Sequence, residues 1–232
     1  MITLLTFAPS FGQPAASPFC VKAMMLLNMA GVAWTTEIYS DPREMPYGKL
    51  PAIRIEDQII ADSENIRAWL EAQGATFDVG LTQAQKALSH ALIRMAEEHL
   101  YFHVVYDRWA DDAVWPVIRD TYFGMIPRPI RGFVTNKIRK PQVASLHKMG
   151  IGRFSPKERL ARAEPDLRAI ADLLTGPFLF GAMPTAADAS VAPQLAGMMA
   201  TPVSTLLGER VRGDKVLVDY VARVNQAVLT RL

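Results

Sequence analysis

Apolar residues in the first third of the chain alternate between short strand-like runs and helical steps of three and four residues. The first helix is marked by Ser17 and Pro18 at its start and by Gly31 at its end, and the second by Ser63 as its cap and by Gly74. Strands are expected at residues 2–7, 32–40, 52–55 and 58–61, and helices at residues 19–30 and 63–73. This order predicts a small α/β module.

The pattern changes after Thr76, where strand-like alternation nearly disappears. Residues 81–108 repeat apolar side chains at helical steps, and further helices are expected at residues 156–174, 186–199 and 214–229. We therefore predict a two-domain protein of the α/β plus all-α class, with an α/β domain over residues 1–76 and an all-helical domain over residues 81–232.

The composition narrows the function classes only modestly. Half of the 232 residues are hydrophobic, 21% are charged and the net charge is +2, which is typical of a soluble globular protein. With this charge and no recognised binding motif, we expect no nucleic-acid partner. No apolar run approaches the roughly 20 residues of a transmembrane segment, and the start MITLLTFAPS lacks the basic region of a signal peptide. The expected location is cytoplasmic.

Cysteine and histidine usage gives little support for a metal site. Cys20 is the only cysteine, so neither an intramolecular disulfide nor a cysteine-based zinc site is expected. His99 and His103 are spaced four residues apart on a predicted helix, but no third ligand stands at a motif spacing. A polar helix face is the preferred interpretation, and no metal is expected.

Three short motifs stand at the ends of the predicted elements of the first module. SPFC opens the first helix, GKLPAI precedes the hairpin, and ADSEN opens the second helix. In this order, followed by a helical half, they resemble the glutathione S-transferases, whose first domain is thioredoxin-like. The stretches SPFCVKAMMLLNMAGV and ADSENIRAWLE are most similar to the failed-axon-connections and metaxin-like branch of that superfamily.

The resemblance gives SPFC a specific role. A dithiol active site would read CPFC, but this chain has Ser17 in the first position. The unpaired N–H groups and partial positive charge of a helix N-terminus favour a nearby thiolate. The family borrows that thiol from glutathione, so the resemblance implies that Ser17 is catalytic and holds the thiolate with a hydrogen bond. Ser-Pro is also an ordinary helix start, which is the alternative interpretation.

The other two motifs would bind the rest of the tripeptide. By resemblance, Pro51 follows a cis peptide bond, Leu50 pairs its backbone with the glutathione cysteinyl backbone, and Lys49 meets the glycyl carboxylate. Asp62 and Ser63 would hold the γ-glutamyl ammonium and carboxylate at a helix N-terminus. The alternatives are a turn before an edge strand with a solvated lysine, and simple capping by Ser63.

Two further stretches have structural interpretations. PTAADAS resembles the family's N-capping box of a core helix, with Thr185 as the cap and Asp188 reaching back to it, so we expect no chemistry there. Aromatic residues between Tyr101 and Trp115 either line a pocket beside the thiol or belong to the core. Cys20 is expected to be buried and inert, and the alternative is a mixed disulfide with glutathione.

Residues 121–157 contain no acidic side chain and are interrupted by prolines and glycines. We interpret them as a basic, irregular loop. It either attracts an anionic substrate, a phosphate-bearing partner or an anionic membrane surface, or it is a solvated loop that balances Asp107, Asp111 and Asp112. Its basic residues are Arg128, Arg131, Lys137, Arg139, Lys140, Lys148, Arg153 and Lys157.

Two functions are therefore considered. The first is a glutathione S-transferase-like enzyme that uses glutathione as its co-substrate and activates the thiol for attack on a small electrophile or peroxide. The alternative is a non-catalytic module of the same fold that contacts proteins or membrane surfaces, as the metaxin-like branch implies. The resemblance also implies a homodimer, the usual assembly of the superfamily.

Overall fold

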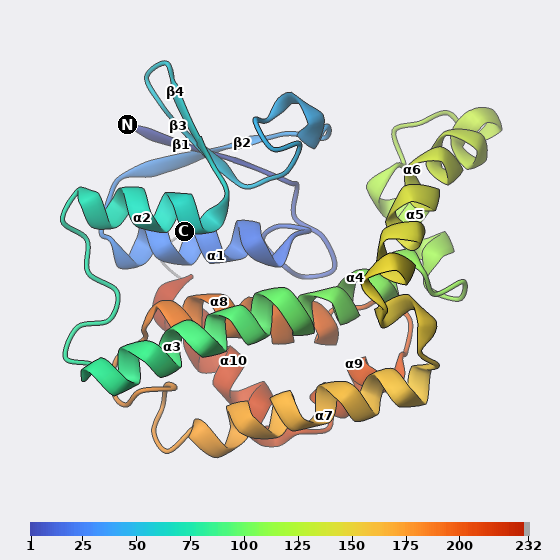
Figure 1. Cartoon of the computed structure of the whole chain (residues 1–232). Helices are drawn as coiled ribbons and strands as arrows, with labels where there is room; N and C mark the ends of the chain where they lie inside the picture. The colour runs from blue at the N-terminus through green and yellow to red at the C-terminus, as the bar shows by residue number, and fades with distance from the viewer. Residues whose placement is uncertain (230–232) are drawn as a thin grey trace.

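The computed structural model describes residues 1–229 and begins with a four-stranded sheet that carries two helices on one face (Figure 1). The strand order is β2-β1-β3-β4, with β1 parallel to β2 and antiparallel to β3. The strands are β1 (Ile2–Thr6), β2 (Trp34–Ile38), β3 (Ala52–Ile55) and β4 (Gln58–Ala61). All four predicted strands are confirmed, although β2 is shorter than residues 32–40.

The two helices of the first half are α1 (Pro18–Met29) and α2 (Ser63–Ala72), and a short 3-10 helix, η1 (Pro42–Glu44), lies between β2 and β3. Gly31, with φ of 66°, allows the chain to leave α1 in a left-handed conformation. Ten of the twelve residues of α1 are buried, because the helix lies between the sheet and the helical half. A helix that is apolar on all sides is stable only in such a position.

The second half contains helices only, in the described part of the chain. Its elements are α3 (Gln83–Met95), the π-helical η2 (Ala96–Leu100), α4 (Tyr101–Trp109), α5 (Trp115–Tyr122), α6 (Arg128–Met149), η3 (Ile151–Arg153), α7 (Pro156–Leu173), α8 (Ala186–Met199), α9 (Leu206–Arg212) and α10 (Lys215–Val228). The helix expected over residues 81–108 is α3, η2 and α4 in direct succession. No helix within residues 1–229 is long and apolar enough to cross a membrane.

The prediction of an irregular loop over residues 121–157 is wrong, because most of this segment is the 22-residue helix α6. Inside a helix, proline removes a backbone hydrogen bond and its ring clashes with the carbonyl four residues earlier, but in the first turn it does neither. Pro127 is the N-cap of α6 and Pro129 lies in its first turn, where the N–H groups have no intrahelical partner. Pro141 alone lies inside α6, where it is exposed.

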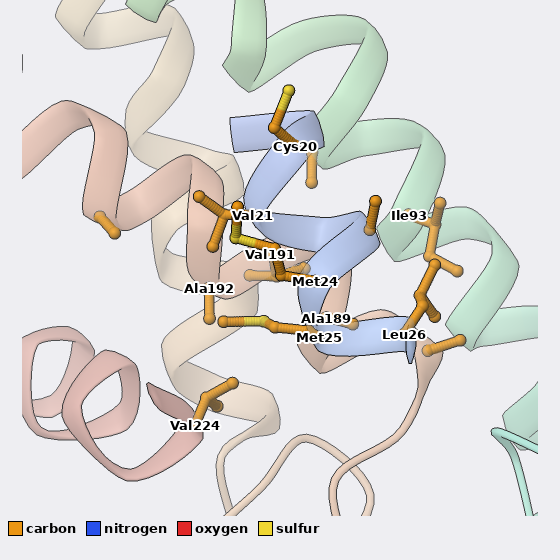
Figure 2. Packing of buried hydrophobic residues seen from close by; sticks show 14 of the residues in the cluster. Cys20, Val21, Met24, Met25, Leu26, Ile93, Ala189, Val191, Ala192 and Val224 are labelled. Atoms are coloured by element: carbon orange, nitrogen blue, oxygen red, sulfur yellow. The ribbon is translucent and has the colours of Figure 1, made fainter. Parts of the chain in front are cut away.

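The core is built around α8, in which every residue from Ala186 to Met198 is buried. Figure 2 shows α1 side chains packed between α3 on one side and α8 and α10 on the other. The capping box predicted for Thr185 and Asp188 is confirmed. The buried Asp188 carboxylate also accepts hydrogen bonds from the Leu179 N–H at 3.0 Å and the Tyr220 hydroxyl at 2.9 Å. This carboxylate therefore ties together the start of α8, the preceding loop and α10.

Candidate functional site

The three sequence motifs meet at one end of the sheet. Leu5 of β1 is paired with Ala52 of β3, and Ala52 is paired with Ala61 of β4. At this end β1 leaves the sheet toward the loop that leads to Ser17, β3 enters directly after Pro51, and β4 leaves into α2. The sheet register therefore brings together the start of α1, the residues before β3 and the start of α2.

Ser17 occupies the N-cap position of α1, but its hydroxyl makes no capping hydrogen bond. Its carbonyl accepts hydrogen bonds from the Cys20 N–H at 3.0 Å and the Val21 N–H at 3.2 Å. The predicted helix start is therefore confirmed, with Ser17 at the N-cap position and Pro18 as the first helical residue, although the Ser17 hydroxyl takes no part in the capping. Cys20 is fully buried, as expected, and burial raises the pKa of its thiol, against hydrogen bonds from the side chains of Thr6 and Ser17.

The peptide bond between Leu50 and Pro51 is cis, as expected. The Pro51 carbonyl accepts a hydrogen bond from the Asp62 N–H at 3.1 Å, which fastens the segment before β3 to the start of α2. The N–H and carbonyl of Leu50 make no backbone hydrogen bond within residues 1–229. Lys49 is exposed. Leu50 therefore has the unpaired backbone groups that strand-like pairing with a peptide requires.

The prediction that Ser63 caps α2 is wrong, because Asp62 is the N-cap. The Asp62 carboxylate accepts a hydrogen bond from the Glu64 N–H at 2.8 Å, and the Asp62 backbone has a non-helical φ of 81°. Aspartate and serine are equally favourable N-cap residues, so the sequence did not determine whether Asp62 or Ser63 caps the helix. Ser63 is the first residue of α2 and only 3% exposed, and its N–H is one of the donors that a helix N-terminus leaves unpaired.

A buried ion-pair network that the sequence analysis missed includes Glu64, the residue that follows Ser63. The Lys22 ammonium, on α1, is 2.5 Å from a Glu97 oxygen on η2 and also pairs with Glu64 on α2. Arg94, on α3, lies 3.3 Å from the second oxygen of Glu97 and 3.4 Å from Glu64. The network therefore joins the first turn of α2 to the helical half. The sequence did contain an indication of this network, because Lys22 is the one charged residue within the apolar run of α1.

The two carboxylates of this network respond to burial differently. Burial raises the pKa of Glu97, and Lys22 only partly opposes this effect. Burial also acts to raise the pKa of Glu64, but Lys22, with Arg67 and Arg94, outweighs it and the net pKa is lowered. Glu64 is therefore held as a carboxylate next to Ser63.

Arg108, on α4, is a second residue that the sequence analysis missed. Its guanidinium is buried and donates hydrogen bonds to the Ala16 carbonyl at 2.7 Å, the Gly197 carbonyl at 3.2 Å and the Tyr122 hydroxyl at 3.3 Å. No carboxylate within the described residues forms an ion pair with it, and its Nε–H has no partner there. A buried positive charge thus holds the residue directly before Ser17.

The aromatic residues divide between the site and the core. The Phe19 ring meets the Tyr101 ring edge to face at 4.7 Å, beside the start of α1. Burial raises the pKa of Tyr101 to about 12, so this hydroxyl stays protonated at neutral pH. Trp109 packs against Trp115 in a separate small cluster with Val114 and Ile118. Only part of the aromatic set therefore adjoins the candidate site.

Two further features lie outside the motifs. An open cavity of about 850 Å³ lies between the β1–α1 loop at residues 9–14 and α10, but none of the predicted glutathione residues lines it. The His99 ring lies 2.5 Å from an Asp166 carboxylate oxygen, whereas His103 is buried. Among residues 1–229, no three His, Cys, Asp or Glu side chains are grouped so as to hold a metal ion.

The fold and the site define a class of protein: a thioredoxin-like module with an open helix N-terminus, joined to an all-helical domain. Family models agree with this class. Residues 18–114 match the glutathione S-transferase N-terminal domain, and residues 157–223 match the glutathione S-transferase C-terminal domain. The chain belongs to the glutathione S-transferase superfamily. Residues 115–156 lie outside both matches.

Curated relatives include a protein named as a glutathione S-transferase and proteins named metaxin or failed axon connections. The isoprene-epoxide–glutathione S-transferase of Rhodococcus sp. (strain AD45) is 29% identical over 238 residues, which cover 97% of this chain and 98% of that protein. Human metaxin-2 is 24% identical over 78% of this chain and 70% of its own length. Drosophila melanogaster failed axon connections is 29% identical over 81% of this chain and 48% of its own length.

Solved structures confirm the fold. A beta-etherase from Sphingobium sp. strain SYK-6 superimposes with a TM-score of 0.62, covering 100% of this chain and 99% of its own. At 14% sequence identity this likeness concerns the fold alone.

Proposed function

We propose that this protein binds glutathione at the end of the sheet where the three motifs meet and activates its thiol for attack on a small electrophile. The observation that carries the proposal is the Ser17 hydroxyl, which stands at the N-terminus of α1 without a capping hydrogen bond. A helix N-terminus favours an anion, and a hydroxyl donor there stabilises a thiolate further. Arg108 adds a buried positive charge next to Ala16.

The described residues fit the tripeptide along its length. When bound, glutathione supplies the reactive thiol. Leu50 offers an unpaired backbone N–H and carbonyl to the cysteinyl residue, and Ser63 offers its hydroxyl and N–H to the γ-glutamyl carboxylate. Lys49, exposed beside Leu50, meets the glycyl carboxylate, and the exposed Asp62 carboxylate meets the ammonium.

An epoxide is the first electrophile to test, because one relative is named for an isoprene epoxide. The Phe19 and Tyr101 rings provide apolar surface beside the start of α1, and the protonated Tyr101 hydroxyl is a donor for the oxygen of an opened epoxide. A cytoplasmic location and a homodimer are part of this proposal. Sedimentation velocity tests the homodimer directly.

Calorimetric titration of reduced glutathione tests the binding site. We expect saturable binding to the wild type and to Ser17→Ala, with Lys49→Ala binding up to about fivefold more weakly, the range for an exposed ion pair. Lys86→Ala is the matched control, since Lys86 is also exposed but lies on α3. Ser17→Ala should lower turnover of an epoxide and raise the pH midpoint of thiolate formation. No binding at millimolar glutathione would contradict the proposal.

A second candidate function is a non-catalytic interaction module. The likeness to metaxin-2 and failed axon connections favours it, and so does the basic helix α6 that lies outside both family matches. This candidate function predicts that Ser17→Ala and Lys49→Ala do not change the affinity of the protein for its partners. The glutathione titration separates the two candidates.

A further inference from the structure

The segment between the two family-model matches has a composition of its own. Residues 115–156 are occupied by α5, α6 and η3, which stand to one side of the helical bundle, in the yellow-green part of Figure 1. No acidic residue occurs between residues 121 and 157. The glutathione site described above uses none of these residues, so their role is a separate question.

Helix α6 presents one continuous stripe to solvent. Residues at steps of three and four share a helix face; four exposed residues of α6 follow such steps, and a fifth lies two further steps of four along the same face. We call them the α6 stripe: Ile130, Phe133, Lys137, Lys140 and Lys148. The opposite face is held against the protein, where Thr135 and Leu146 are buried and Arg139 donates to the Trp109 carbonyl at 2.7 Å.

The stripe combines large apolar side chains with unpaired positive charges. Phe133 is 67% exposed, Ile130 is 52% exposed, and Met125, just before α6, is 74% exposed. Within residues 1–229 none of the three stripe lysines takes part in a salt bridge, and Lys137 lies over the Phe133 ring at 4.5 Å. By contrast, the inward-facing Arg139 pairs with Asp112 at 2.7 Å.

We propose that the α6 stripe docks the protein onto an anionic lipid bilayer, with Met125, Ile130 and Phe133 entering the headgroup region and the lysines facing the headgroups. A helix with exposed aromatic and aliphatic side chains and adjacent lysines binds such surfaces through apolar burial and electrostatic attraction. A second copy of the chain is disfavoured as the occupant. A two-fold interface would place the stripe lysines of both copies against each other without an acidic residue of the same segment between them.

Co-sedimentation with vesicles tests the proposal and requires no glutathione. The wild type should bind phosphatidylcholine vesicles that contain phosphatidylserine, with affinity falling as salt is raised, and should not bind phosphatidylcholine alone. Lys137→Glu combined with Lys140→Glu should weaken binding at least about 25-fold, since each lysine near such a surface contributes about fivefold. Phe133→Ser should weaken binding with little change in its salt dependence.

Two exposed positions elsewhere provide matched controls. Lys86→Glu reverses a lysine on α3, and Val79→Ser removes an apolar side chain that is 75% exposed, so neither should change vesicle binding. All these positions are exposed, and thermal melts check that each variant folds. The proposal is overturned if the wild type does not bind, if neutral vesicles bind equally well, or if the controls lose as much affinity. A dimer that Phe133→Ser dissociates, with no vesicle binding, would assign the stripe to a second copy instead.

Discussion

Replacing Lys22 by methionine tests the buried network that includes Glu64, next to Ser63 of the candidate site. Methionine has a similar length, so the change removes the charge while keeping most of the packing. At 2.5 Å, the attraction between Lys22 and Glu97 amounts to about 7 kcal/mol at an effective dielectric constant of about 20. Most of this gain offsets the cost of taking both charges out of water. Removing only the lysine leaves Glu97, which is 4% exposed, with Arg94 as its remaining cation.

We expect Lys22→Met to lower the free energy of unfolding by about 3 kcal/mol at pH 7, the lower end for breaking a buried pair, because Arg94 still compensates Glu97 in part. The loss should depend on pH. In the variant the pKa of Glu97 rises further and the lowering of the Glu64 pKa is weakened, so the folded state binds protons more tightly relative to the unfolded chain. The stability gap to the wild type should therefore widen as pH rises above the ordinary value of 4.5 and close below it.

Urea unfolding at several pH values measures this gap, with the m-value as a check that both proteins unfold alike. The double variant Lys22→Met/Glu97→Gln removes both charges and should recover part of the loss. Together with the single variant Glu97→Gln it gives the coupling energy of the pair. A loss below about 1 kcal/mol at pH 7, or a gap that does not change with pH, would refute the reasoning.

Three further predictions concern other buried groups. Arg108→Gln should raise the pH midpoint of thiolate formation in bound glutathione, whereas Arg108→Lys, which keeps the charge, should leave it closer to that of the wild type. Absorbance of the thiolate against pH measures the midpoint. Equal midpoints in Arg108→Gln and the wild type would show that Arg108 only holds the loop in place. Asp188→Asn should lower the free energy of unfolding in urea by about 3 kcal/mol, because the new asparagine NH2 group would face N–H and O–H donors that now bind the carboxylate. Tyr220→Phe removes one of these donors and should lower it by only about 1 kcal/mol, so equal losses would contradict this prediction. Cys20 should react with a thiol reagent only after unfolding, and rapid reaction of the native protein would show that its burial and raised pKa do not protect it.

The strands and α1 were predictable because their information is local. Apolar runs of the right period, together with breakers such as Gly31, define them without reference to the rest of the chain. The prediction of a loop over residues 121–157 was wrong because it, too, used only local signals. Prolines were read as breakers, although Pro127 and Pro129 stand at a helix start, where a proline causes no loss. Whether a proline lies at the start or in the interior of a helix depends on where that helix begins, and the sequence left this undetermined.

The candidate site was predictable only in part. SPFC, GKLPAI and ADSEN locate its outline, since each precedes a helix or strand whose start is visible in the sequence. The charged groups that set the electrostatics of the site could not be predicted, because they lie far from these motifs in the sequence. Arg108 contacts a carbonyl 92 residues earlier, and Lys22 pairs with a glutamate 75 residues later. No periodic pattern connects residues over such separations, and the packing of α1, α3, η2 and α4 around α8 brings them together.

One helix links the candidate glutathione site to the α6 stripe. From α4, Arg108 reaches the residue before Ser17, and from α6, Arg139 reaches the Trp109 and Ala110 carbonyls at the end of α4. Both contacts are hydrogen bonds from a guanidinium to backbone carbonyls, which fix position more strongly than an exposed ion pair does. The segment outside both family matches is therefore fastened to the helix that positions Ser17, and substitutions at Arg139 offer a direct way to ask whether the two sites influence each other.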